Sequence, residues 1–204
     1  SGGGRFDAGM LYYAPQAWTS DNSDAICRLK IQYGTSLVYP VSAMGAHVSI
    51  TPNHQVGRNT PLDTRGWIAM SGNFGFELDI TKQTTENLQK ITEQISWYKE
   101  HRELIQFGDF YRIQAPSETG ATAWLFKNQE EALLVYSNGL ARPAVPVQYL
   151  QTKFLDENAI YQDSTTKKYY SGSELNHAGI LVPRIKGDFE VIAYHWKKTE
   201  ISNK

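Results

Sequence analysis

The hydrophobic pattern of residues 85–107 constrains the fold of the first half of the chain most strongly. Apolar side chains recur there at helical spacings, which predicts a long helix with one buried face. Glu86 lies in its first turn, Arg102 lies near its end and Gly108 follows it, as is typical of helix ends. Before this helix, strand-like apolar runs alternate with helical ones. That alternation predicts a parallel sheet covered by helices.

The expected elements before residue 85 are three strands and two helices. Three parallel strands cannot close a barrel by themselves. The strands are expected over Gly9–Trp18, over Leu37–Tyr39 with Gly45–Ser49, and over Phe74–Leu78; the helices are expected over Asn22–Tyr33, with Gly34 as its C-cap, and from Thr60-Pro61 through Met70.

From Phe110 onward the pattern changes to short strands with frequent turn signals and no expected helix. This half is therefore predicted to be a small antiparallel β-sandwich, which gives two domains, 1–108 and 109–204. In the clearest strand, Phe189–Lys197, the residues Val191, Ala193 and His195 share one face and Ile192, Tyr194 and Trp196 share the other. The other expected strands are Phe110–Ile113, Ala123–Lys127, Ala132–Tyr136, Val145–Phe154 and Lys168–Tyr170.

The composition excludes several classes of protein. A total of 20 Lys and Arg against 21 Asp and Glu gives a net charge of −1, so nothing favours a nucleic-acid partner. Cys27 is the only cysteine, which excludes an internal disulfide and a Cys-rich metal site. No apolar run reaches the ~20 residues that a membrane helix needs. We therefore expect a soluble, cytoplasmic protein.

The segment from Trp18 to Ala25 contains the main catalytic candidate. A carboxyl between the end of an apolar run and the start of a helix lies where α/β barrels place their catalytic groups, so Asp21 is a candidate acid. The same residues, Ser20–Asp24, are also typical of a helix N-cap. Trp18 is suited to stack on a sugar ring or to pack in the core. The residues alone leave both alternatives open.

Other polar candidates are weaker. Ser1-Gly2-Gly3-Gly4 has the composition of a linker, although its glycines would also let a backbone approach a ligand. His47 and His54 lie on either side of a turn, and a zinc site would need a third ligand that the sequence does not indicate. We therefore expect no metal site. Asp24 is expected to pair with Arg28, one helical turn further on.

Several motifs occur together in one order: Gly2-Gly3-Gly4-Arg5-Phe6-Asp7, Gly9–Tyr13, Trp18–Ala25, Gly45-Ala46-His47-Val48-Ser49, Pro52-Asn53-His54-Gln55, Gly72–Asp79 and Ser171-Gly172-Ser173-Glu174-Leu175. Through these motifs the chain resembles the retaining α-galactosidases of glycoside hydrolase family 36. The resemblance covers most of the chain.

This resemblance implies both a fold and an activity. Residues 1 to about 108 would be the last part of a (β/α)₈ TIM barrel, and the rest would be the family's C-terminal β-sandwich. Asp21 would be the general acid/base, and Gly2 and Gly3 would contact the substrate, a terminal α-galactoside of melibiose or raffinose type. The family resemblance also implies that no cofactor is needed and that the whole enzyme is a homotetramer.

The chain departs from the family pattern at two points. No cysteine precedes the Ser1-Gly2 run, and the family's nucleophile segment, Lys-Trp-Asp-x-Asn-Arg, is missing. Because retaining hydrolysis needs two carboxyl groups about 5 to 5.5 Å apart, Asp21 supplies only half of a mechanism. We therefore expect the 204-residue chain alone to be inactive.

Three alternatives remain from the sequence. The enzyme could transfer galactose or act on a related substrate such as an α-N-acetylgalactosaminide. As an isolated chain it could be a non-catalytic fragment or interaction module, because three barrel strands leave an open sheet edge and apolar faces. A free carbohydrate-binding sandwich conflicts with an acid motif in the other half of the chain.

Overall fold

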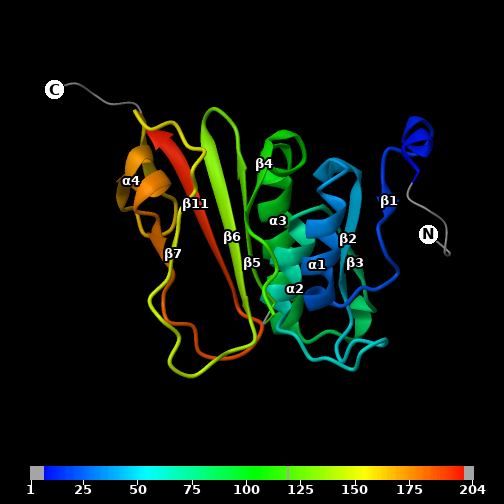
Figure 1. Ribbon diagram of the computed structural model, residues 1–204. Coiled ribbons are helices and arrows are strands. Elements are labelled where there is room, and N and C mark those ends of the chain that lie inside the picture. Colours follow the sequence, from blue (N-terminus) through cyan, green and yellow to red (C-terminus); the bar gives the residue numbers. More distant parts are fainter. Residues whose placement is uncertain (1–6, 119, 200–204) are drawn as a thin grey trace. The chain divides into compact units, whose positions relative to one another are not determined.

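The computed structural model describes residues 7–118 and 120–199. It divides into two compact units, Ser1–Phe107 and Gly108–Lys204. Figure 1 labels the elements of each unit. Gly2 and Gly3 lie outside the described residues. Within the described part of the chain, no helix is both long and apolar enough to cross a lipid bilayer.

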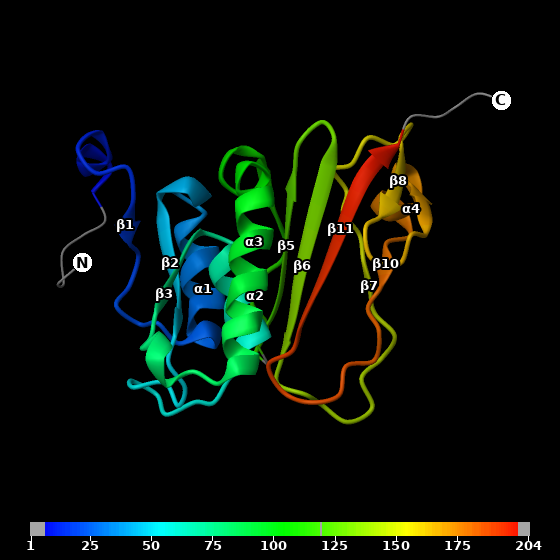
Figure 2. The same cartoon turned by 180° about the vertical axis from the view of Figure 1, so that it is seen from behind.

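The first unit contains a three-stranded parallel sheet in the order β1-β2-β3. A helix follows each strand along the chain, which is the connection that parallel neighbours require. Figure 2 shows these helices together on one side of the sheet. The elements are β1 (Ala17–Trp18), α1 (Ala25–Thr35), β2 (Met44–Ser49), α2 (Leu62–Met70), β3 (Asn73–Glu77) and α3 (Thr85–Phe107), with short 3₁₀ helices η1 (Ala8–Tyr12), η2 (Val41–Ala43) and η3 (Ile80–Lys82).

The core of this unit lies between the sheet and its helices. Ala46 and Val48 of β2 pack there with Leu62, Ala69 and Ile91 of α2 and α3. Alternate residues of a strand face opposite sides of a sheet, so the other residues of β2 project from the opposite face. Those residues are Gly45, His47 and Ser49, and their partners on β3 are Asn73, Gly75 and Glu77.

The strand predicted over Gly9–Trp18 is wrong for most of its length. A 3₁₀ helix occupies Ala8–Tyr12, and its cap is Asp7, whose carboxylate accepts the Gly9 N–H at 2.8 Å. Only Ala17–Trp18 pairs with β2. The aromatic residues that suggested a buried strand lie at the surface, since Tyr12 is 87% exposed.

The strand predicted over Leu37–Tyr39 is also wrong. These residues form a turn, in which the N–H groups of Val38 and Tyr39 both donate to the Thr35 carbonyl. Leu37 and Val38 are exposed, so their apolar character reflects no burial. Gly34 is not a C-cap either, because α1 continues to Thr35 and Ser36 is the capping residue.

Replacement of Gly34 by alanine should stabilise the protein. A Cβ at Gly34 would meet nothing within 4 Å, and its backbone is not in the left-handed region. Because alanine lowers the entropy of the unfolded chain, we expect a gain of about 0.5–1 kcal/mol, measured by urea unfolding. Gly57→Ala is the matched control, because a Cβ at Gly57 would also meet nothing within 4 Å, but its φ is +67°. An alanine is strained in that conformation, so this variant should be less stable than the parent. A loss of stability in Gly34→Ala would contradict this prediction.

The second unit is an antiparallel β domain, as the sequence predicts. One sheet has six strands in the order β4-β5-β6-β11-β8-β9, and a two-stranded ribbon pairs β10 with β7. The elements are β4 (Asp109–Gln114), β5 (Gly120–Lys127), β6 (Glu131–Gly139), β7 (Tyr149–Leu150), β8 (Ile160–Asp163), β9 (Tyr169–Ser171), α4 (Gly172–His177), β10 (Ile180–Leu181) and β11 (Val191–Thr199).

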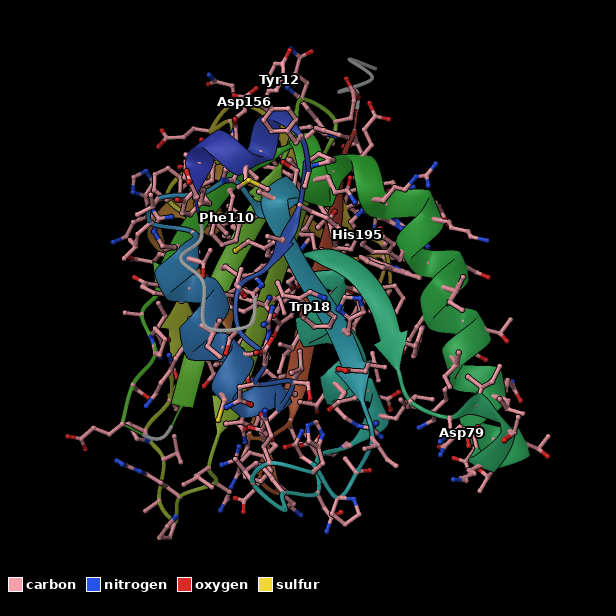
Figure 3. The ribbon with its side chains drawn as sticks, turned by 90° about the vertical axis from the view of Figure 1, so that its right-hand side faces the viewer. Tyr12, Trp18, Asp79, Phe110, Asp156 and His195 are labelled. Carbon is pink, nitrogen blue, oxygen red and sulfur yellow. The ribbon has the colours of Figure 1, made fainter. Side chains whose placement is uncertain are left out.

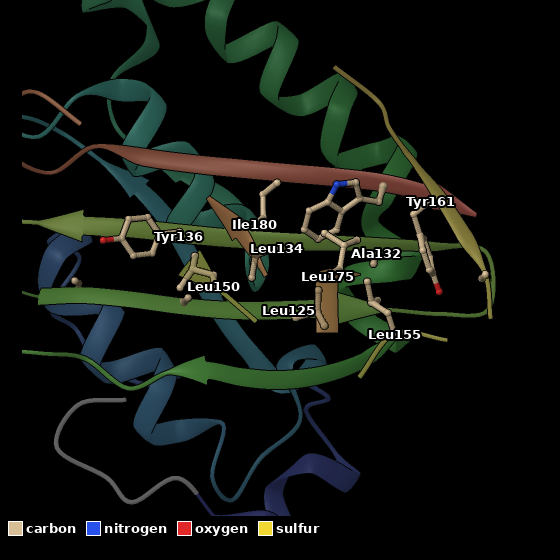
Figure 4. Packing of buried hydrophobic residues seen from close by; sticks show 13 residues of the cluster. Leu125, Ala132, Leu134, Tyr136, Leu150, Leu155, Tyr161, Leu175 and Ile180 are labelled. Carbon is tan, nitrogen blue, oxygen red and sulfur yellow. The ribbon is translucent and has the colours of Figure 1, made fainter. Parts of the chain in front are cut away.

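The ribbon and α4 cover one face of the six-stranded sheet. Figure 4 shows Leu125 and Leu134 of the sheet beside Leu150, Leu175 and Ile180 of the covering layer. This gives the domain two layers around one hydrophobic core.

Four elements of this unit differ from the sequence prediction. The helix α4 and the strands β8 and β10 were not expected, and within the predicted strand Val145–Phe154 only Tyr149–Leu150 forms a strand. The prediction failed because these elements are short and give too little hydrophobic periodicity to distinguish them from turns.

Candidate active site

Two loops at the carboxyl edge of the three-stranded sheet form the candidate site. Because the strands are parallel, the loops that follow β1 and β2 emerge at the same edge, which is where α/β barrels bind substrate. The loop after β1, residues 19–24, contains Asp21. The loop after β2 runs from residue 50 to Pro61 and contains the motif Pro52-Asn53-His54-Gln55.

The helix N-cap predicted within Ser20–Asp24 is confirmed, and the capping residue is Asp24 rather than Asp21. Asp24 is the N-cap of α1, and its carboxylate accepts the Cys27 N–H at 2.9 Å. Asn22 in turn accepts the Asp24 N–H at 3.0 Å. Asp21 lies three residues before the cap and is exposed. Capping is therefore the task of Asp24, and it does not account for Asp21.

The predicted pair between Asp24 and Arg28 is wrong. Asp24 is buried and pairs with Arg58 of the neighbouring loop. Arg28 instead donates from Nη2 to the Gly45 carbonyl at 2.6 Å and from Nη1 to the Ser20 carbonyl at 3.3 Å. Burial lowers the pKa of Arg28 to about 10. The Arg28 guanidinium is taken up by these backbone carbonyls, so the Asp24 carboxylate pairs with Arg58 instead.

Trp18 lies on the face of the sheet opposite to the helices. Figure 3 shows its side chain over the strands, and its indole stacks on the imidazole of His47 with ring centroids 4.0 Å apart and planes at 22°. Trp18 is 36% exposed in this three-stranded part of the sheet. A Cβ at Gly75 would lie 2.6 Å from Cδ2 of His47, so the stack depends on a glycine in β3.

His47 lies in β2, and His54 lies in the loop that follows it. His47 is held in the stack, and no described residue bonds to its buried Nδ1. Burial lowers the pKa of His47, Glu77 partly opposes that shift and Arg28 adds to it. His54 is exposed in the loop that follows β2.

The contacts between the two loops were not predicted from the sequence. The Nε2 of Gln55 donates to the backbone carbonyl of Asp21 at 3.1 Å. Asn53, which is 3% exposed, contacts Ser23 through its side-chain amide. The only signal for these contacts was the polar motif itself, because the partners lie about thirty residues apart.

Comparison with known families identifies the two units. Residues 1–108 match the Melibiase family, and residues 121–195 match the glycosyl hydrolase family 36 C-terminal domain. The chain belongs to glycoside hydrolase family 36. The first unit therefore is the end of the family's TIM barrel and the second is its antiparallel C-terminal domain, as the sequence resemblance implied.

Individual relatives agree with this assignment. The α-galactosidase AgaA of Geobacillus stearothermophilus is 54% identical over 198 residues, and Mel36A of Lactobacillus acidophilus is 46% identical over 198 residues; each match covers 96% of this chain and 27% of the relative. The crystal structure of AgaA superposes with a TM-score of 0.93 at 53% identity, over 97% of this chain and 28% of that one. The α-galactosidase of Lactobacillus brevis gives a TM-score of 0.94 at 43% identity, over 99% of this chain and 28% of that one. The 204-residue chain thus spans about a quarter of the length of these relatives.

Proposed function

We propose that the full-length protein that carries this chain is a retaining α-galactosidase acting on terminal α-galactosides of melibiose or raffinose type. The observation that carries the proposal is the exposed Asp21 at the carboxyl edge of the barrel sheet, outside the cap of α1. The relatives named above are α-galactosidases. Variants of AgaA have also been crystallised in complex with raffinose and with stachyose.

In this proposal Asp21 is the general acid/base. A carboxylate nucleophile, supplied by a segment that this sequence does not contain, attacks the anomeric carbon while Asp21 gives its proton to the departing glycosidic oxygen. The Asp21 carboxylate then takes a proton from water as the water oxygen displaces the nucleophile and releases galactose. The chain therefore supplies one of the two carboxyl groups.

Trp18 is proposed to contact the substrate. Its indole has one face against His47, so the other face is the one that a sugar ring would stack on. Gly2 and Gly3 are also proposed to contact the substrate, on the family resemblance alone. The same resemblance supports a homotetramer without a cofactor. The single free thiol, Cys27, is compatible with the proposed cytoplasmic location.

The experiment that tests the proposal compares two purified proteins. The full-length protein should release galactose from raffinose and from 4-nitrophenyl α-galactoside, and nuclear magnetic resonance should detect the α-anomer first. The isolated 204-residue chain should release none, because it lacks the nucleophile. Turnover by the isolated chain, or β-galactose as the first product, would contradict the proposal. Preference for an α-N-acetylgalactosaminide would favour the alternative substrate.

A further inference from the structure

The loop that follows β2 contacts Asp21 directly. Gln55 donates its side-chain N–H to the backbone carbonyl of Asp21 at 3.1 Å, across 34 residues of sequence. The bond fixes the main chain of Asp21 and uses none of its carboxylate oxygens. The bond therefore holds the point at which the Asp21 side chain is attached.

Asn53 determines where Gln55 lies. Its side-chain oxygen accepts the N–H groups of Gln55 at 3.0 Å and Val56 at 3.2 Å, and its backbone carbonyl accepts the Gly57 N–H at 2.8 Å. Its side-chain nitrogen donates to the hydroxyl of Ser23 at 3.4 Å. Asn53 thus holds a tight turn and attaches that turn to the loop of Asp21.

The same two loops are joined at a third point. Arg58 forms an ion pair with Asp24, three residues after Asp21. The hydroxyl of Ser49, at the end of β2, donates to the Ser23 carbonyl at 3.0 Å. Contacts from one segment therefore hold Asp21, Ser23 and Asp24. A catalytic carboxyl needs this kind of support, because displacements of about 1 Å cost large factors in rate.

We propose that Gln55 is a positioning residue for Asp21, and that Asn53 holds Gln55 in place. This inference rests on the proposed role of Asp21 as the acid/base. Loss of the Gln55 bond would let the Asp21 main chain move and would take the carboxyl away from the glycosidic oxygen. The loss should then be largest for substrates whose leaving group needs a proton.

The test uses Gln55→Ala in the full-length protein and two substrates. Raffinose has a poor leaving group, whereas 2,4-dinitrophenyl α-galactoside departs without protonation. We expect kcat/KM for raffinose to fall by about tenfold and that for the aryl substrate by less than about twofold, as for a loss of general acid catalysis. Gln83→Ala is the matched control, because Gln83 likewise donates its amide to an aspartate carbonyl, that of Asp79, at 3.3 Å.

An equal loss on both substrates, or no loss, would overturn the role of Gln55. If Gln55→Ala melts early, Gln55→Glu serves as the second variant, since it keeps the size of the side chain and removes the donor at neutral pH. If Asp21→Asn itself shows no dependence on the leaving group, then the proposed function fails rather than the role of Gln55.

Discussion

Replacement of Asp21 by asparagine in the full-length protein should lower kcat/KM for raffinose by about 10²- to 10⁴-fold, the range typical of a lost general acid. Asparagine has nearly the same shape as aspartate but cannot give a proton to the glycosidic oxygen. The fold should survive, because Gln55 bonds to the backbone of residue 21 and Asp24 makes the helix cap. Circular dichroism and steady-state kinetics measure the two effects.

The leaving group separates the two roles of Asp21. For 2,4-dinitrophenyl α-galactoside the first step needs no acid, so kcat/KM should change little. The second step needs the base, so the covalent intermediate should accumulate and produce a burst of dinitrophenol. Azide, which needs no deprotonation, should restore turnover as galactosyl azide. Near-normal activity on both substrates would refute the assignment of Asp21.

Asp24→Asn provides a matched control in the same motif. Asp24 is buried, and its charge pairs with Arg58. Asparagine also caps helices, so the expected effect is a lower melting temperature from the lost ion pair rather than a change in leaving-group dependence. A leaving-group effect in Asp24→Asn as large as that in Asp21→Asn would mean that the motif acts only through its structure.

The parts of the fold that the sequence predicts well are long and periodic. The predicted helix over residues 85–107 has the bounds of α3, and the strand predicted over Phe189–Lys197 corresponds to β11 at Val191–Thr199. In both cases the pattern extends over enough residues to identify the type of element. The predicted strands that contain Tyr12 and Val38 were wrong, because the residue type alone does not show whether an apolar side chain is buried or exposed.

The candidate site also has parts that could be predicted from the sequence and parts that could not. Asp21 could be selected because its position between a strand and a helix is a local property of the sequence. The partner of Asp24 could not be predicted, because local spacing favours Arg28 whereas the tertiary structure places Arg58 beside Asp24. Gln55 and Asn53 also act on residues about thirty positions away. Contacts of that kind follow only from the pairing of β1 with β2.

Replacement of Gly172 by alanine should strongly destabilise the second unit. A Cβ at Gly172 would lie 1.9 Å from the carbonyl oxygen of Asp156 and 2.7 Å from its carbonyl carbon. Both are backbone atoms, so no change of rotamer relieves the clash. We expect a loss of about 2–4 kcal/mol, measured by urea unfolding of the full-length protein. Ser173→Ala, the neighbouring control, should stay within about 0.5 kcal/mol of the parent.

The surroundings of Gly172 explain why the clash cannot relax cheaply. The helix α4 is attached to the segment of Asp156 by the buried Asn176, whose side chain accepts the Leu155 N–H at 3.0 Å and donates to the Leu155 carbonyl at 2.8 Å. Leu175 is 0% exposed in the core, so a shift of α4 would also open a cavity. An unchanged stability would show that the Asp156 segment moves away. A loss of stability would show that Gly172 is required, because α4 begins against the main chain of Asp156 and Asn176 holds that segment in place.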